Sequence, residues 1–353
     1  MRQEQEDASE EITEVAPGIL RLQLPIAFTG LGHVNTYALE DGDGFAIVDP
    51  GLPGEESWRA LGRRLDAAGI PVRRVHTVLV THSHPDHFGG SGLLAAESGA
   101  RIVASEHFRL WWRADEGDDA ELEPARSGPD DAGPDDADTI APLLERTTPW
   151  GRPVIAADSE QRRRIEAMRT DTEPWFRTPE ITHALGDADR ISLARREWVA
   201  LHTPGHTFDH LCLFDPEGGV LLSGDHVLPS ITPHISGLFQ GDPLAQYVSS
   251  LHRVAGLSGV TCVLPAHGHP FTDLSGRVDA IVAHHEGRLD TLRAISRELG
   301  WSGVVELSHR LFSPRSWGPM AESETYAHLE HLRLLGDADR RDDDGELRYL
   351  VTA

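Results

Sequence analysis

The stretch that decides the fold is THSHPDH, residues 81–87. It directly follows the apolar run VHTVLV, residues 75–80, which predicts a buried strand. It leads into a helix that begins at Pro85, because proline is favoured at the first helical position. A polar loop between a buried strand and a helix is where α/β folds gather their functional groups.

Three histidines and one aspartate of this loop, His82, His84, Asp86 and His87, are candidate metal ligands. His82 and His84 are two residues apart in an extended turn, so both side chains can point to the same side. Asp86 and His87 fall in the first helical turn, where a carboxylate suits the positive end of the helix dipole. Imidazole and carboxylate donors at this spacing suit zinc or a similar divalent cation.

Four further motifs repeat this arrangement of a strand followed by polar residues. They are VDPG at 48–51, HTPGH at 202–206, SGD at 223–225 and PAH at 265–267. Each motif places a candidate ligand just past the end of an apolar, strand-like run. One such motif is weak evidence, but four in this order favour a shared metal site over a loop of surface histidines.

The first half of the chain alternates strand and helix patterns before an insertion begins. A hairpin is expected at 36–49 and a helix at 55–68, as in an α/β fold. Residues 114–138 hold eleven acidic residues and one basic residue, which predicts a solvated loop. Residues 139–180 predict helical pieces of an insertion that returns to the core.

Beyond residue 272 the apolar pattern has helical spacing. The expected elements are helices at 278–295, 302–311 and 322–335 and a terminal strand at 347–351. His284 and His285 fall within the first of these helices, and we assign them to its faces rather than to metal binding.

The composition of the 353-residue chain favours a small-molecule substrate. The 57 acidic and 32 basic side chains give a formal charge of −25, and a surface of this sign repels polyphosphate. Neither nucleic acid nor membrane is an expected partner, since no apolar run could span a bilayer. The sequence leaves open whether the chain forms a homodimer. Cys212 and Cys262 lie in strand-like runs, which predicts buried free thiols and suits a reducing cytoplasm.

The ordered set of motifs resembles that of the metallo-β-lactamase superfamily. The resemblance covers roughly residues 15–270 and implies an αββα sandwich, an α/β fold, with a dinuclear metal centre at one edge. Carried over position by position, it implies seven ligands: His82, His84 and His206 for the first ion, Asp86, His87 and His267 for the second, and Asp225 as the bridge.

The resemblance also assigns roles to neighbouring residues. Asp86 would position the attacking water and is the one candidate catalytic residue. Asp49 would hydrogen-bond the histidine loop, and His202 would have a structural role. Asp209 and His210 resemble the lactamase-β-like-2 and glyoxalase-II-like branch, whose C-terminal module is winged-helix-like.

This branch implies a division of the chain into two parts. The expected domains are a catalytic domain at 1–272, which carries the insertion at about 106–180, and a small helical module at 273–353. Aromatic residues of the insertion either line the mouth of the site or pack within the fold: Trp111, Trp112, Trp150, Trp175 and Phe176. His226 and His234 have the same two alternatives, substrate contact or packing.

The implied activity is hydrolysis by a water that two divalent ions activate. Zinc is the first expectation, with manganese or iron as alternatives. The expected substrate is an ester, a thioester or a lactone. A metal-dependent endoribonuclease or phosphodiesterase stays open because arginines cluster at 162–164, although the overall charge opposes it. A persulfide dioxygenase with a single iron is the third reading.

Overall fold

The fold is that of a computed structural model with two compact units. The structure describes residues 2–28, 30–42, 44–110, 147–153, 159–238, 241–343 and 345–352. The acidic loop expected at 114–138 lies outside these residues, as do Trp111 and Trp112. Unit 1 contains residues 1–109, 167–233 and 249–280, and unit 2 contains residues 110–166, 234–248 and 281–353.

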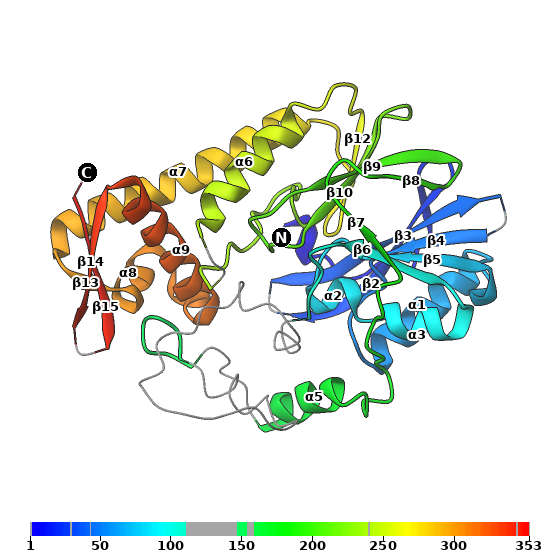
Figure 1. Ribbon diagram of the computed structural model, residues 1–353, viewed down its shortest axis with the longest axis horizontal. Helices are drawn as coiled ribbons and strands as arrows, with labels where there is room; N and C mark the ends of the chain where they lie inside the picture. Colours follow the sequence, from blue (N-terminus) through cyan, green and yellow to red (C-terminus); the bar gives the residue numbers. More distant parts are fainter. Residues whose placement is uncertain are drawn as a thin grey trace. The chain divides into compact units, whose positions relative to one another are not determined.

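Unit 1 contains a seven-stranded sheet with its strands in sequence order (Figure 1). The strands are β1 (Thr13–Ala16), β2 (Ile19–Phe28), β3 (Leu31–Asp41), β4 (Gly44–Val48), β5 (Val75–Leu79), β6 (Arg101–Ser105) and β7 (His183–Leu185). Strands β1 to β4 pair antiparallel, which confirms the expected hairpin at β3–β4. Strands β4 to β7 pair parallel, so the polar loops that follow β4 and β5 emerge at one edge.

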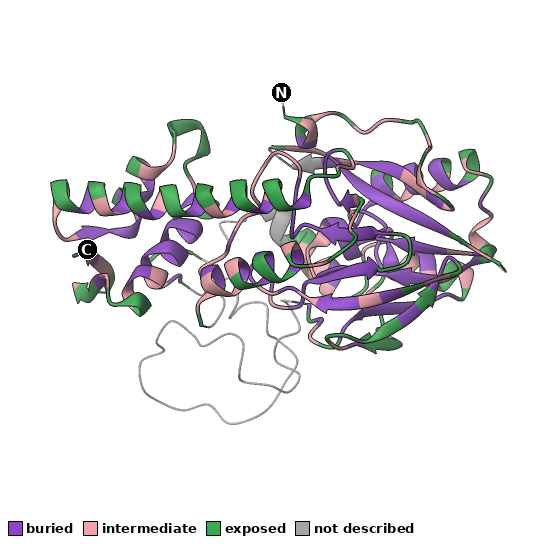
Figure 2. Cartoon of the chain, turned by 90° about the horizontal axis from the view of Figure 1, so that it is seen from above, coloured by how far each residue is buried: buried purple, intermediate pink, exposed green. Residues whose placement is uncertain are grey.

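A second, five-stranded sheet completes the sandwich, in the order β12-β11-β10-β9-β8. Its strands are β8 (Arg190–Leu193), β9 (Arg196–His202), β10 (Leu211–Asp215), β11 (Val220–Gly224) and β12 (Cys262–Pro265). Apolar side chains of both sheets form one core, which includes Leu39, Val48, Leu79, Trp198, Leu213 and Leu264. Figure 2 shows the strands largely in the colour of buried residues, as a core between two sheets requires.

Helices lie against both sheets of unit 1. Unit 1 contains α1 (Glu55–Ala67), α2 (Pro85–Phe88) and α3 (Ser91–Ser98), with single 3-10 turns at Gln3–Gln5 and Val72–Arg74. Three further helices have residues in both units: α5 (Ser159–Arg169), α6 (Pro243–Ala255) and α7 (Leu274–Leu299). Helix α1 packs on β2, and α3 packs on β5 and β6. In α6, the Ser250 hydroxyl donates to Pro204 O at 2.9 Å and the Arg253 guanidinium to His202 O at 3.1 Å. The expected αββα sandwich is confirmed.

Unit 2 contains α7 from Ile281 onward and a small α/β arrangement. It comprises β13 (Ser302–Gly303), α8 (Val304–Leu311), a 3-10 turn (Pro314–Ser316), α9 (Pro319–Leu335), β14 (Ala338–Asp343) and β15 (Glu346–Val351). The expected helices and the terminal strand are confirmed, except that residues 302–303 form β13 and the second helix begins at Val304. Neither β13 nor β14 was expected from the sequence. The residues ADRRDD of β14 are mostly exposed, and among the described strands β14 pairs with β15 alone, at the edge of the sheet.

The thiols and the helices add two simple findings. Cys212 and Cys262 are free, as expected, although Cys262 is half-buried rather than buried. Among the described residues, no helix has an apolar stretch long enough to cross a bilayer.

Candidate metal centre

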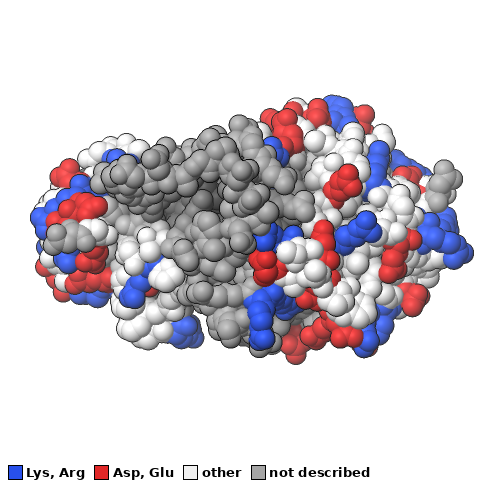
Figure 3. Space-filling view, turned by 60° about the horizontal axis from the view of Figure 1, so that its bottom comes forward, with Lys and Arg blue, Asp and Glu red and all other residues white. Residues whose placement is uncertain are grey.

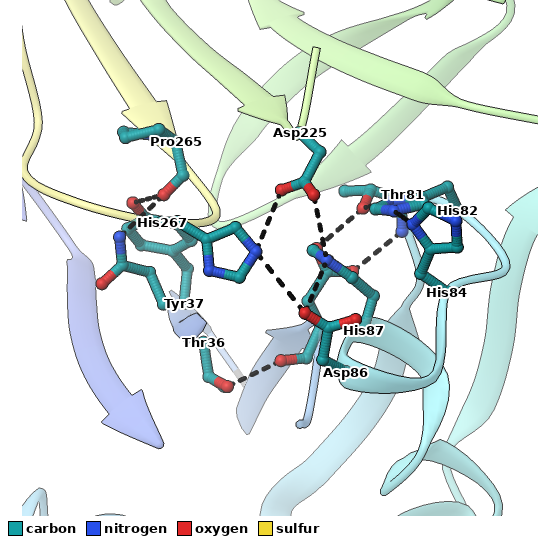
Figure 4. Close-up of polar contacts among 12 residues, drawn as sticks. Thr36, Tyr37, Thr81, His82, His84, Asp86, His87, Asp225, Pro265 and His267 are labelled. Carbon is teal, nitrogen blue, oxygen red and sulfur yellow. Dashed lines mark hydrogen bonds and ion pairs between the residues drawn. The ribbon is translucent and has the colours of Figure 1, made fainter. Parts of the chain in front are cut away.

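The structure brings the seven expected ligands together at one edge of the sandwich. Figure 4 labels all of them except His206. Each ligand follows a strand, as the sequence predicts: His82 and His84 after β5, His206 after β9, Asp225 after β11 and His267 after β12. Asp86 and His87 lie on α2, whose first residue is Pro85. The loops are adjacent because the parallel strands β4–β5 and β11–β12 end at the same edge.

Four residues form a first donor set: His82, His84, His206 and Asp225, with one ligand atom from each lying within 4.8 Å of the others. His84 Nδ1 is 3.0 Å from His82 Nε2 and 3.0 Å from His206 Nε2. Three imidazole nitrogens converging on one point match the donor type and number of a zinc site.

Three residues form a second donor set: Asp86, His87 and His267, which also have ligand atoms within 4.8 Å of one another. Asp86 Oδ2 is 3.5 Å from His87 Nε2 and 3.5 Å from His267 Nε2. All three side chains are buried, with Asp86 only 6% exposed.

The carboxylate of Asp225 lies between the two donor sets. Its Oδ2 is 3.5 Å from His206 Nε2 of the first set. Its Oδ1 is 3.2 Å from His267 Nε2 of the second set, and Oδ2 is 3.7 Å from His87 Nε2. A single carboxylate in this place can bridge two cations.

Asp49 accepts three hydrogen bonds from residues of the histidine loop. Its Oδ1 accepts the Thr81 amide at 2.8 Å, and Oδ2 accepts the Thr81 hydroxyl at 2.8 Å and His87 Nδ1–H at 2.9 Å. Because the Thr81 hydroxyl donates to Asp49, it accepts a hydrogen bond from His82 Nδ1–H at 3.0 Å. Asp49 therefore fixes the tautomers of His82 and His87 so that each Nε2 carries the lone pair toward the centre.

His267 is oriented in the same manner by the backbone of β3. Its Nδ1–H donates to His33 O at 2.7 Å, which leaves Nε2 for a metal. The His33 ring in turn accepts the Gly268 amide at Nε2, 3.1 Å away, and donates from Nδ1 to Glu6 O at 2.8 Å. Burial lowers the pKa of His33, so it stays neutral and can play both roles.

The segment at residues 2–6 joins two of the ligand-bearing loops. Glu4, fully buried, accepts the Ser230 amide at 2.7 Å, the Ile231 amide at 3.1 Å and the Ser230 hydroxyl. Residues 230 and 231 belong to the loop after Asp225, and Glu6 contacts His33 beside the loop of His267. Sequence analysis missed this segment, because a buried glutamate in a run of charged residues looks like any solvated one.

His210 holds the backbone of Asp225. Its Nδ1–H donates to the Thr203 hydroxyl at 2.8 Å, and its Nε2 accepts the Asp225 amide at 3.1 Å. Gly224 has a φ of +50°, and a Cβ there would lie 2.6 Å from His210 Nε2. Glycine is therefore required for the close approach that positions Asp225.

The electrostatics of the centre fit divalent cations. Burial alone would lower the pKa of His87, but the carboxylates of Asp86, Asp225 and Asp49 raise it well above its ordinary value. In the part of the chain that the structure describes, His87 Nε2, His267 Nε2 and Asp225 Oδ1 are buried without a hydrogen-bond partner. Buried donor atoms without partners, in a field that favours positive charge, fit a metal that they would coordinate.

Comparison with known proteins identifies the family. A sequence model of the metallo-beta-lactamase superfamily matches residues 29–267, which is well over half of the chain. The chain belongs to this superfamily. The resemblance drawn from the motifs is thereby confirmed, and with it the fold.

Individual members of the superfamily are similar over most of the chain. The probable metallo-hydrolase YqjP of Bacillus subtilis (strain 168) is 24% identical over 324 residues, which cover 89% of this chain and 92% of that protein. The hydroxyacylglutathione hydrolase of Rhodobacter capsulatus is 23% identical over 265 residues, 75% of either protein. Metallo-beta-lactamase family protein TTHA1429 of Thermus thermophilus has a solved structure with a TM-score of 0.76 and 29% identity, covering 96% of this chain and 100% of that chain. The protein is a metallo-hydrolase with the metallo-β-lactamase fold.

Three further histidines were not assigned as ligands, and the structure gives each of them other contacts. His202 Nε2–H donates to Phe208 O at 2.6 Å, a structural role as expected. His226 is buried, with its ring 5.8 Å from that of His210. His234 Nε2–H donates to Met320 O at 3.1 Å within unit 2. Of the two alternatives for His226 and His234, these contacts support packing.

The described aromatic residues of the insertion also pack within the fold. Phe176 is 3% exposed, with its ring 6.2 Å from that of Phe88. Trp150, in unit 2, donates its indole N–H to Glu322 at 2.9 Å, and its ring lies 5.0 Å from that of Tyr326. Trp175 is half-buried and has the Arg59 guanidinium over its ring. For Trp150 and Phe176, packing rather than lining the site is the role that these contacts support.

Proposed function

We propose that the protein is a dinuclear metal-dependent hydrolase whose substrate is a small thioester, within the wider class of esters, thioesters and lactones. The observation that carries the proposal is the position of Asp225, whose carboxylate lies within 4 Å of ligand nitrogens from both donor sets. The similarity to a hydroxyacylglutathione hydrolase supports a thioester as the bond that is cleaved.

The seven ligands would hold two metal ions, and zinc is the first candidate for both. His82, His84 and His206 would hold the first ion, and Asp86, His87 and His267 the second, with Asp225 shared. Such ions supply Lewis-acid activation of water and of the acyl carbon to be attacked. Asp86 would accept a hydrogen bond from the attacking water and so orient it. Its carboxylate is placed for this role because Oδ2 lies 3.5 Å from Nε2 of both His87 and His267, and the residue is buried.

The charge pattern supports a small molecule over nucleic acid as the substrate. On the face that Figure 3 shows, arginine side chains of the described residues are interspersed with acidic ones rather than gathered in one basic patch. The protein has a formal charge of −25, so it would repel a phosphodiester polymer, which is also negatively charged.

The test is a substrate screen with metal-loaded protein and parallel metal analysis. Candidate substrates are acyl-CoA and glutathione thioesters, carboxyl esters, an N-acyl lactone, single-stranded RNA and a glutathione persulfide. We expect thioester turnover with two divalent ions at the centre in unit 1, and no turnover in a His206→Ala variant. Cleavage of RNA alone would indicate the endoribonuclease reading, and persulfide oxidation with one iron per chain the dioxygenase reading.

A further inference from the structure

Unit 2 contains a second cluster of metal-ligating side chains, separate from the centre in unit 1. His285 on α7 meets Glu324 and His328 on α9, and one ligand atom from each residue lies within 4.8 Å of the other two. All three are buried, with exposed fractions of 1%, 7% and 0%. A buried pair of imidazoles beside a carboxylate is a donor set that zinc uses.

The ring of His328 is fixed with one nitrogen toward this cluster. Its Nδ1–H donates to Glu324 O, one turn earlier on α9, at 2.7 Å. The lone pair of the neutral ring is therefore on Nε2, which lies 3.0 Å from Nδ1 of His285. This is the arrangement that Asp49 and the His33 carbonyl impose on the histidines of unit 1.

His285 shares one feature with the ligands in unit 1. Its 3.0 Å nitrogen-to-nitrogen contact with His328 repeats the 3.0 Å contacts of His84 with His82 and His206, and both His285 and His84 make these contacts through Nδ1. The other ring nitrogen of His285, Nε2, is buried, and among the described residues nothing hydrogen-bonds to it.

The surroundings keep both imidazole rings neutral. Burial lowers the pKa of His285 to about 2 and that of His328 to about 3, so protons do not occupy the lone pairs at neutral pH. The guanidinium of Arg288, which stacks over Phe312, contacts Glu324 Oε1. A carboxylate has about four acceptor positions, which is more than the contact with Arg288 uses.

We propose that His285, Glu324 and His328 form a further site for a divalent transition-metal ion such as zinc, which links α7 to α9 inside unit 2. The site is structural, because its ligands are buried and belong to a different unit from the hydrolytic centre. It does not depend on which substrate the hydrolase uses.

The test compares the zinc content of the full-length protein and its variants after dialysis against buffered micromolar zinc. We expect the double variant His285→Gln/His328→Gln to bind one equivalent fewer than the unsubstituted protein while it keeps full hydrolytic activity. His284→Gln is the matched control, since His284 is the exposed neighbour on α7, and it should retain every equivalent. Equal zinc content in the double variant and the unsubstituted protein would overturn the proposal.

A second measurement covers the case in which the double variant does not fold. Crystals of the unsubstituted protein grown with zinc should show anomalous density at the zinc edge between His285 and His328. Absence of that density, with anomalous density present at Asp225, would show that the two imidazoles share only a hydrogen bond. Hydrolysis is measured on the same protein, so loss of the thioesterase proposal would leave this result standing.

Discussion

The two donor clusters use the same types of side chain but differ in how their charge is balanced. In unit 1, the carboxylates of Asp49, Asp86 and Asp225 lie around the imidazoles, and within the described residues no arginine pairs with them. In unit 2, the only carboxylate of the cluster, Glu324, already has Arg288 as its partner. Buried like charges are unfavourable unless something neutralises them, so the centre in unit 1 requires cations far more than the cluster in unit 2 does.

Removal of all metal gives the largest expected effect and tests this difference directly. Chelation should abolish hydrolysis and lower the melting temperature, because an ion at 1,000 times its dissociation constant stabilises the fold by about 4 kcal/mol. Differential scanning calorimetry and a turnover assay measure both effects, and added zinc should restore both. A verified metal-free protein with full activity would contradict the metallo-hydrolase assignment.

Asp86→Asn should have the next largest effect. The amide keeps the shape of the side chain but loses the charge that binds a cation and orients water, so we expect turnover to fall by about 100-fold or more. The measurement is kcat at saturating metal, with circular dichroism to verify the fold. Asp66→Asn, on the exposed face of α1, is the matched control and should leave kcat unchanged. A near-normal rate for Asp86→Asn would remove Asp86 from the reaction.

Glu4→Gln should have an intermediate effect. The amide cannot accept all the hydrogen bonds from Ser230 and Ile231 as well as the carboxylate does, which should cost about 1–3 kcal/mol of unfolding free energy. We expect metal affinity to fall between about twofold and tenfold, less than for a residue that contacts a ligand directly. Urea unfolding and metal titration measure these quantities. The exposed Glu11→Gln is the control, and equal behaviour of the two variants would mean that the segment does not support the centre.

His202→Gln should have the smallest effect. His202 shares the HTPGH motif with His206 but contacts Phe208 O rather than any of the seven ligands. Metal affinity should therefore stay within about twofold of the unsubstituted protein. Metal titration is the measurement, and His206→Gln should show a large loss in the same assay. A comparable loss in both variants would place His202 among the ligands.

The sequence predicted the centre in unit 1 because each of its ligands follows a strand. A strand end has a readable pattern, an apolar run that stops at a polar residue, and parallel strands bring such ends together. Asp49 and Asp225 could be placed for the same reason. The tautomers could not, since they depend on partners such as the His33 carbonyl that are remote in sequence.

The cluster in unit 2 could not be predicted in this way. His285 and His328 are 43 positions apart on two helices, and each histidine alone fits the face of an amphipathic helix. Which faces meet depends on how α7 and α9 pack, and periodicity does not determine that. Strand β14 was not predicted for a related reason. Its residues are charged like those of a solvated loop, and the pairing with β15 that makes them a strand cannot be read from the sequence pattern.

The contacts of Glu4 have a consequence for the order in which the protein can fold during synthesis. Glu4 and Ser230 are 226 positions apart, and His33 and Gly268 are 235 apart. The loop at 82–87 therefore leaves the ribosome long before Asp225 and His267 exist. Contacts of such separation close late. The first donor set is complete in the nascent chain once Asp225 has emerged, but the second lacks His267 until about residue 270, so the dinuclear centre can assemble only after that point.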